Sequence, residues 1–159
     1  RWVVYYALKI RDNMTTIVYD HKSRQVACDS RQTTGGFVNS DEAIKYQYRG
    51  AVIWFVAGRT NHVSDFIDGF MSNEEPPNCW DCNGVFVQDG VAYSIFIDEA
   101  AYSVERLSFS ETVGSGAWLA LAALDFGKSA KQAVEYAATR DTCTGGKVHV
   151  YDIEKGEFI

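Results

Sequence analysis

The side chains in this sequence that most often carry chemistry are three histidines and four cysteines, and neither set forms a strong motif. His21 lies in an expected turn, His62 near an expected helix start and His149 in an expected strand, and none accompanies a nucleophile motif. The segment "CWDC" gives Cys79 and Cys82 the spacing of a metal or redox pair, but a structural zinc site needs four ligands and the sequence has no second such pair. A redox pair is expected to open a helix after a strand, whereas this pair lies in a proline-containing loop. We interpret the pair as loop cysteines, keep zinc as a minor alternative, and expect no metal and no cofactor.

A set of short segments carries more information together than any of them does alone. They are "TTIV", "ACDSRQTTGG", "IKY", "FVAGR", "VGSG" and "RDTCTGG". In their order and spacing they resemble the proteasome β-subunit family of N-terminal nucleophile (Ntn) hydrolases, especially the bacterial HslV-type peptidase. The resemblance runs from Thr15 to about Ile153. In that family a lysine follows the aspartate of the second strand by sixteen residues, and Asp29 and Lys45 have this separation.

The chemistry available to Thr15, Asp29 and Lys45 follows from their residue types. A threonine hydroxyl needs a base to take its proton, and an N-terminal threonine carries one in its own α-amine. A free α-amine titrates at about 7.7–8.0, so part of it is neutral near physiological pH. The ammonium of Lys45 would lower the pKa of that amine, and Asp29 would hold Lys45 by charge and hydrogen bond. The set therefore needs Thr15 to be the first residue of the working protein.

The resemblance implies roles for four further residues. The backbone N–H of Gly58 would stabilise the negative charge that develops on the attacked carbonyl, where a strand ends and a helix begins. Asp141 and Thr144 match positions that support the threonine amine and hydroxyl. Ser115 belongs to a Gly-Ser-Gly loop that the family shares, although Ala117 stands where proteasome subunits commonly have serine.

Two assignments in the same set are weaker. Arg31 is expected to pair with a carboxylate and so hold a loop, and Thr33 matches a position whose backbone aligns substrate as an extra strand. Singly, every residue of the set has an ordinary structural explanation, such as a strand threonine, a turn aspartate or a solvated lysine. Their joint occurrence at the family spacing favours the catalytic interpretation.

The elements that must position these residues are visible as short apolar runs and turns. "TTIVYD" and "QVACDSR" predict a hairpin, and 51–58 predicts a strand buried on both faces. Apolar spacing predicts one helix that ends near Met71, and Asp89-Gly90 predicts a second hairpin. Helical segments follow from 114, with a capping box over 129–132, and "KVHVYDI" predicts a final strand.

The resulting expectation is an α+β fold, specifically a proteasome-like four-layer αββα sandwich with a reduced helical layer. A single domain over 15–159 follows a leader, upstream extension or propeptide over 1–14. The segment "SNEEPPNCWDC" replaces a second long helix that the family would place after the first. This departure affects the expected ring contacts and the docking of an ATPase more than the active site.

Composition limits the function classes. The formal charge of −6 and the scattered basic residues give no footprint for nucleic acid. No apolar run reaches the roughly 20 residues of a membrane span, and the uneven cysteines favour a reducing cytosol. We expect a cytoplasmic threonine-type endopeptidase that degrades unfolded proteins inside a homo-oligomeric ring fed by an AAA+ unfoldase. The alternatives are a small-molecule amidase on the same fold and a non-catalytic proteasome-like subunit.

Met14 is central to this choice. We expect it to be the initiator, removed before the small residue Thr15 so that the α-amine becomes free. If the preceding residues are retained, Thr15 carries an amide in place of the amine and the base is lost.

Overall fold

The first of two five-stranded sheets contains the hairpin that the sequence predicts at the start of the domain. The computed structural model describes residues 15–77 and 81–159. The strands of this sheet are β1 (Thr16–Asp20), β2 (Gln25–Cys28), β10 (Glu111–Gly114), β11 (His149–Asp152) and β12 (Glu157–Phe158). They run in the order β10-β1-β2-β11-β12, and every neighbouring pair is antiparallel. The predicted N-terminal hairpin and the predicted final strand are thereby confirmed.

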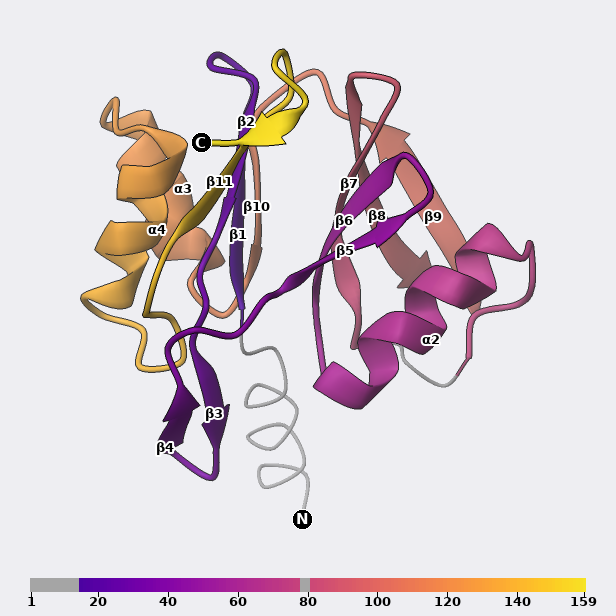
Figure 1. Ribbon diagram of the computed structural model, residues 1–159, viewed down its shortest axis with the longest axis horizontal. Helices are drawn as coiled ribbons and strands as arrows, with labels where there is room; N and C mark the ends of the chain where they lie inside the picture. The colour runs from indigo at the N-terminus through magenta and orange to yellow at the C-terminus, as the bar shows by residue number, and fades with distance from the viewer. Residues whose placement is uncertain (1–14, 78–80) are drawn as a thin grey trace.

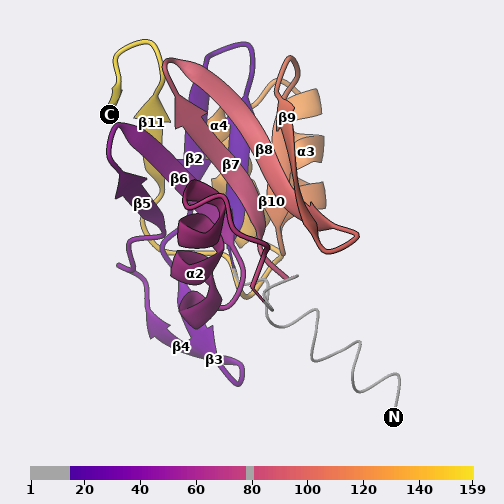
Figure 2. The ribbon, with the colours of Figure 1, turned by 90° about the vertical axis from the view of Figure 1, so that its right-hand side faces the viewer.

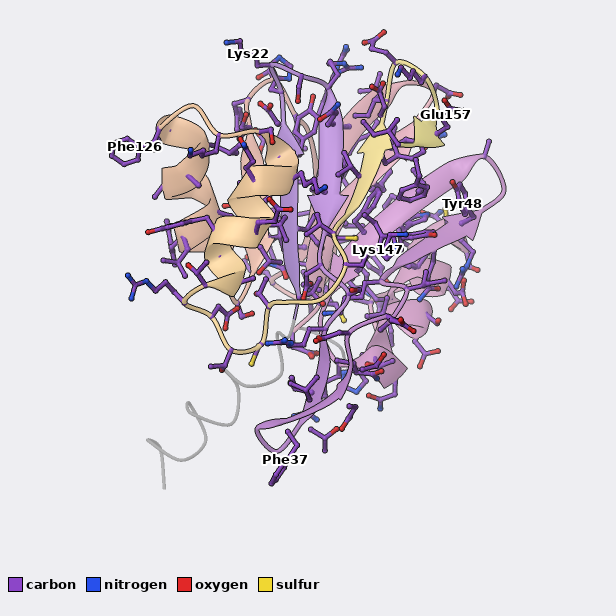
Figure 3. All side chains as sticks on the ribbon, turned by 60° about the vertical axis from the view of Figure 1, so that its left-hand side comes forward. Lys22, Phe37, Tyr48, Phe126, Lys147 and Glu157 are labelled. Carbon is purple, nitrogen blue, oxygen red and sulfur yellow. The ribbon has the colours of Figure 1, made fainter. Side chains whose placement is uncertain are left out.

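The second sheet is also antiparallel and follows the chain in simple order. Its strands are β5 (Tyr46–Arg49), β6 (Val52–Ala57), β7 (Asn83–Gln88), β8 (Val91–Asp98) and β9 (Ala101–Arg106). All six residues of β6 are buried, and β7 and β8 join at 89–90, as predicted. A separate hairpin of β3 (Gln32–Thr34) and β4 (Phe37–Ser40) extends beyond the sheets. Its tip residue Phe37 is 78% exposed and points away from the body of the protein (Figure 3).

Helices contribute little of the described chain. They are α2 (Thr60–Met71), α3 (Ala117–Asp125) and α4 (Ala130–Ala138), of 12, 9 and 9 residues. The predicted end of α2 at Met71 is confirmed, and so is the capping box, in which Ser129 and Gln132 satisfy each other's backbone N–H groups.

The expected four-layer αββα sandwich is wrong. Three antiparallel sheets dominate the described residues, and the three short helices lie beside them without forming full layers (Figures 1 and 2). The chain after α2 does not continue as a helix, because 72–77 is polar and contains two consecutive prolines. Of the helices within 15–77 and 81–159, α2 lies next to the second sheet, and α3 and α4 lie next to the first.

The strand period of two explains how the sheets share one core. Ile17 and Tyr19 of β1 point to the second sheet, where they meet side chains such as Phe55. Val18, between them in sequence, points the other way and packs against α3 and α4. Trp54 of β6 likewise faces α2. This arrangement brings the starts and ends of several strands to one end of the molecule, where the candidate site lies.

Within the described residues, no helix combines the length and the apolar character needed to cross a membrane.

Candidate active site

Thr15 lies directly before β1 and is 5% exposed. Its carbonyl oxygen accepts a hydrogen bond from the N–H of Ser115 at 3.0 Å. Gly114 makes this close approach possible, because its φ is 101° and a Cβ there would overlap the carbonyl of Thr15. The backbone of Thr15 is thus held by the Gly-Ser-Gly loop over 114–116.

Asp29 follows β2 and is fully buried. Its carboxylate accepts hydrogen bonds from the N–H groups of Thr16, Arg31 and Gly145, at 3.1, 3.2 and 3.0 Å. The ammonium of Lys45 lies 3.1 and 3.3 Å from its two oxygens. Burial raises the pKa of the Asp29 carboxyl, and Lys45 and the backbone donors offset only part of this effect. The predicted contact between Asp29 and Lys45 is confirmed.

One cavity of about 120 Å³ is lined by Thr15, Lys45 and Gly58, which come from three separate parts of the chain. Gly58 follows the last residue of β6, and its φ of 149° is a conformation that other residues rarely adopt. Val56 and Val63 add apolar walls to the same cavity. The predicted nucleophile, the lysine and the predicted oxyanion donor therefore share one cavity.

A directed chain of hydrogen bonds runs behind Thr15. The carboxylate of Asp141 can only accept, so the hydroxyls of Ser115 and Thr144 both donate to it, each at 2.5 Å. Because the hydroxyl of Thr144 donates its hydrogen bond to Asp141, its oxygen accepts from the hydroxyl of Thr16 at 2.6 Å. Thr16 in turn accepts from the N–H of Gly116 at 3.1 Å. Ser115, Asp141 and Thr144, which the resemblance implies separately, are therefore in contact, and their supporting roles stay predictions.

Arg31 and Thr33 have different outcomes. The guanidinium of Arg31 forms two hydrogen bonds to Asp41, at 2.8 and 3.1 Å, so the expected pairing with a carboxylate is confirmed. This contact also lowers the pKa of Asp41. Thr33 lies in β3 and is 5% exposed, and among the residues described it is its neighbour Gln32 that lines the cavity. The role of Thr33 in aligning substrate stays a prediction.

Metal binding has no support in the described part of the chain. No group of three or more histidine, cysteine, aspartate or glutamate side chains there is arranged to hold an ion. Cys79 lies outside the described residues, as does the leader over 1–14. Cys82 is buried, and its sulfur packs closely against Gly58, where a Cβ would lie 2.6 Å from it.

Two features of the site were missed by sequence reasoning. Thr16 has the sequence context of an ordinary strand residue, and only its contact with Thr144, 128 residues away, gives it a place in the hydrogen-bond chain. The sequence assigns no role to His62, yet its Nδ1 lies 3.1 Å from the carboxylate of Asp81, beside the turn that contains Gly58. The segment "CWDC" drew attention for its cysteines, whereas its aspartate makes this contact.

Comparison with known proteins gives a similarity of fold. No family model matches the sequence, and no curated protein matches it. The structure is similar to that of Thiobacillus denitrificans BPH, with a TM-score of 0.64 and 18% sequence identity over 86% of this chain and 95% of that one. A structure of Thiobacillus denitrificans BPH in complex with epoxomicin has the same TM-score and identity, and covers 86% and 96% of the two chains. At this identity the likeness shows a shared fold.

Proposed function

We propose that this protein is a threonine-type peptidase in which Thr15, freed of the residues before it, is the nucleophile. The observation that carries the proposal is the shared cavity of Thr15, Lys45 and Gly58, with the buried carboxylate of Asp29 in contact with Lys45. Acyl transfer by a threonine requires a nucleophile, a base and a donor for the developing negative charge; the cavity contains the first and the last, and the α-amine of Thr15 is the base.

The reaction begins when the α-amine of Thr15 takes the proton of its own hydroxyl. The oxygen then attacks a peptide carbonyl, and the N–H of Gly58 donates to the oxyanion that forms. The ammonium of Thr15 returns the proton to the leaving nitrogen as the carbon–nitrogen bond breaks, which leaves an ester on Thr15. Water attacks this ester, again with the amine as base, and releases the carboxylate product.

Lys45 sets the electrostatics of these steps. Its ammonium disfavours protonation of the nearby α-amine and stabilises negative charge on the Thr15 oxygen. Asp29 keeps the side chain of Lys45 in place with two contacts of 3.1 and 3.3 Å. The N–H groups that also bind Asp29 fix the carboxylate itself, so the position of the ammonium is determined by the backbone.

The hydrogen-bond chain of Ser115, Asp141, Thr144 and Thr16 supports the other side of the nucleophile. Ser115 binds the carbonyl of Thr15 through its N–H and Asp141 through its hydroxyl. The carboxylate of Asp141 is thus two hydrogen bonds from the carbonyl of Thr15, and this connected polar network holds the backbone of the nucleophile in place.

The cavity indicates the kind of substrate. Its apolar walls include Ile44, Val56 and Val63, so it fits an apolar side chain next to the attacked carbonyl. The small-molecule amidase is the competing function on the same chemistry. Degradation of unfolded proteins within a ring, together with an AAA+ unfoldase, is the larger assembly that the family resemblance implies.

The test uses protein whose N-terminus is Thr15, verified by mass spectrometry. We expect hydrolysis of peptides with an apolar residue before the cut bond, loss of activity in Thr15→Ala, and partial activity in Thr15→Ser, which keeps a hydroxyl. Epoxomicin, the ligand of the similar protein, is a suitable probe. Undiminished hydrolysis by Thr15→Ala contradicts the proposal. A monomer in solution that cleaves only small amides favours the amidase.

A further inference from the structure

Helix α2 begins next to Gly58 without a cap of its own. Its N-cap residue is Arg59, whose side chain makes no capping hydrogen bond, and its first turn has no acidic residue. Side-chain acceptors and negative charges normally satisfy the free N–H groups at this end of a helix. The start of α2 therefore depends on groups from elsewhere in the chain.

Asp81 supplies the acceptor from a segment about twenty residues further on. One carboxylate oxygen accepts a hydrogen bond from the N–H of Arg59 at 3.2 Å. The other lies 3.1 Å from Nδ1 of His62, in the first turn of the helix. The side chain of Asp81 is only 10% exposed, which limits competition from water for these contacts. Asp81 thus holds two points of the turn that follows β6.

The next residue, Cys82, fixes the same turn by packing. It is 1% exposed, and its sulfur and Cα would lie 2.6 and 3.2 Å from a Cβ placed on Gly58. Asp81 and Cys82 therefore contact the 58–62 turn side by side, one through hydrogen bonds and one through its sulfur. The two observations are independent of each other.

The geometry points to Asp81 as a positioning residue for the Gly58 N–H, an inference that rests on the proposed function. On one side of Gly58 the pairing of β6 with β7 ends, with Ala57 opposite Asn83. The peptide after Gly58 contains the N–H of Arg59, which Asp81 holds. The N–H of Gly58 belongs to the first peptide beyond the last strand pair, and glycine has the greatest conformational freedom of any residue, so the direction of this N–H also depends on how the chain after Gly58 is held.

Two ligands distinguish a positioning role of Asp81 from a general effect on the stability of the protein. A peptide aldehyde adds the Thr15 hydroxyl and forms a tetrahedral oxyanion that needs the Gly58 N–H, while the matching peptide alcohol binds the same cavity without this step. The ratio of their affinities reports covalent addition, which needs the Thr15 hydroxyl, its base and the Gly58 N–H, and the turn that Asp81 contacts contains only the last of these. A purely structural role of Asp81 would lower the melting temperature and leave the ratio unchanged.

The variants are Asp81→Ala, which removes the acceptor, and Asp81→Asn, which keeps an oxygen for the Arg59 N–H. Asp65→Ala is the matched control, because it removes the same charge from an exposed position of α2. We expect the aldehyde preference to fall about tenfold or more in Asp81→Ala, to remain mostly intact in Asp81→Asn, and to be unchanged in Asp65→Ala.

The outcomes distinguish the two proposals. A wild-type protein with a free Thr15 amine and no preference for the aldehyde overturns the proposed function, and this inference with it. A wild type that prefers the aldehyde, together with an Asp81→Ala variant that keeps the full preference, overturns the inference alone. If Asp81→Ala does not fold, the test depends on Asp81→Asn, which keeps an oxygen for the Arg59 N–H. A tenfold loss of aldehyde preference in a folded Asp81→Asn variant would show that this hydrogen bond does not position Gly58, and would overturn the inference.

Discussion

Removal of the Lys45 ammonium is the sharpest test of the site, because it should affect stability and activity by separate routes. In Lys45→Met the fully buried carboxylate of Asp29 keeps its three N–H donors and loses its cation. Loss of one partner of a buried ion pair costs about 3–5 kcal/mol, and the remaining donors place this variant near the lower value. For a domain of this size, about 3 kcal/mol corresponds to a decrease of roughly 6–12 °C in melting temperature.

A second substitution then separates the two effects. Asp29→Asn in the Lys45→Met background removes the unpaired charge, although its amide NH₂ faces N–H donors and cannot accept from all of them. We expect about half of the lost unfolding free energy to return, measured by urea denaturation, with peptide hydrolysis still at background. If activity returns together with stability, Lys45 only supports the fold and the proposed mechanism is wrong.

The pH dependence of stability gives an independent check. Burial raises the pKa of Asp29, and Lys45 opposes this, so Lys45→Met should raise the pKa further. The folded variant then holds a proton that the unfolded chain releases near its ordinary pKa of about 3.9, so the unfolding free energy falls as pH rises from there to the folded pKa. Lys45→Met should therefore lose more unfolding free energy than the double variant as the pH rises from about 4 to about 7.5. An equal change in the two variants would refute the reasoning.

Three further predictions follow from close contacts. Gly58→Ala should lower kcat by about 10²-fold or more, because the new Cβ would meet the sulfur of Cys82 at 2.6 Å and turn the N–H away; unchanged kcat in a folded variant contradicts this. Thr16→Val keeps the shape of the side chain and removes the hydroxyl that donates to Thr144, so the free energy of unfolding in urea should fall by about 1–3 kcal/mol. A decrease below the error of the measurement would exclude the directed chain of hydrogen bonds. Burial raises the pKa of the Cys28 thiol to about 12, so iodoacetamide at pH 8 should modify Cys28 only after denaturation. Rapid modification of Cys28 itself in the native protein, located by mass spectrometry, would argue against this burial.

Local patterns predicted the secondary structure well because their causes are local. The hairpin before Asp29 follows from two β-branched runs around a polar turn, and the capping box of Ser129 and Gln132 is a contact between residues three apart. The four-layer expectation failed because it depended on how much helix covers each sheet. This quantity came from the family resemblance, and the polar, proline-containing chain after α2 does not supply it.

The residues of the site also divide into those that the sequence predicts and those that only the tertiary structure reveals. The contact of Asp29 with Lys45 was predictable because the two residues have the separation that the family resemblance implies. Thr16 and Asp81 were not predictable, since each acts through a partner brought near by tertiary structure. A threonine in a strand and an aspartate in a polar loop have common structural explanations, and no local feature distinguishes these two from such residues.

The hairpin of β1 and β2 links the fold to the chemistry through its register. Thr15 comes one residue before β1 and Asp29 one residue after β2, so both lie at the open end of the same hairpin. Thr16 and Asp29 bind each other twice, through Thr16 N–H to the Asp29 carboxylate and through Asp29 N–H to the Thr16 carbonyl at 3.3 Å. A shift of one residue in the register of β2 against β1 would turn every side chain of β2 to the other face of the sheet. It would also move the Asp29 carboxylate away from Lys45. Residues added in pairs near the turn at 21–24 would lengthen both strands equally and leave this end unchanged. The number of residues between Thr15 and Asp29 can therefore change in steps of two. A single residue inserted within β1 or β2 changes the register, and should abolish activity where no β-bulge restores it.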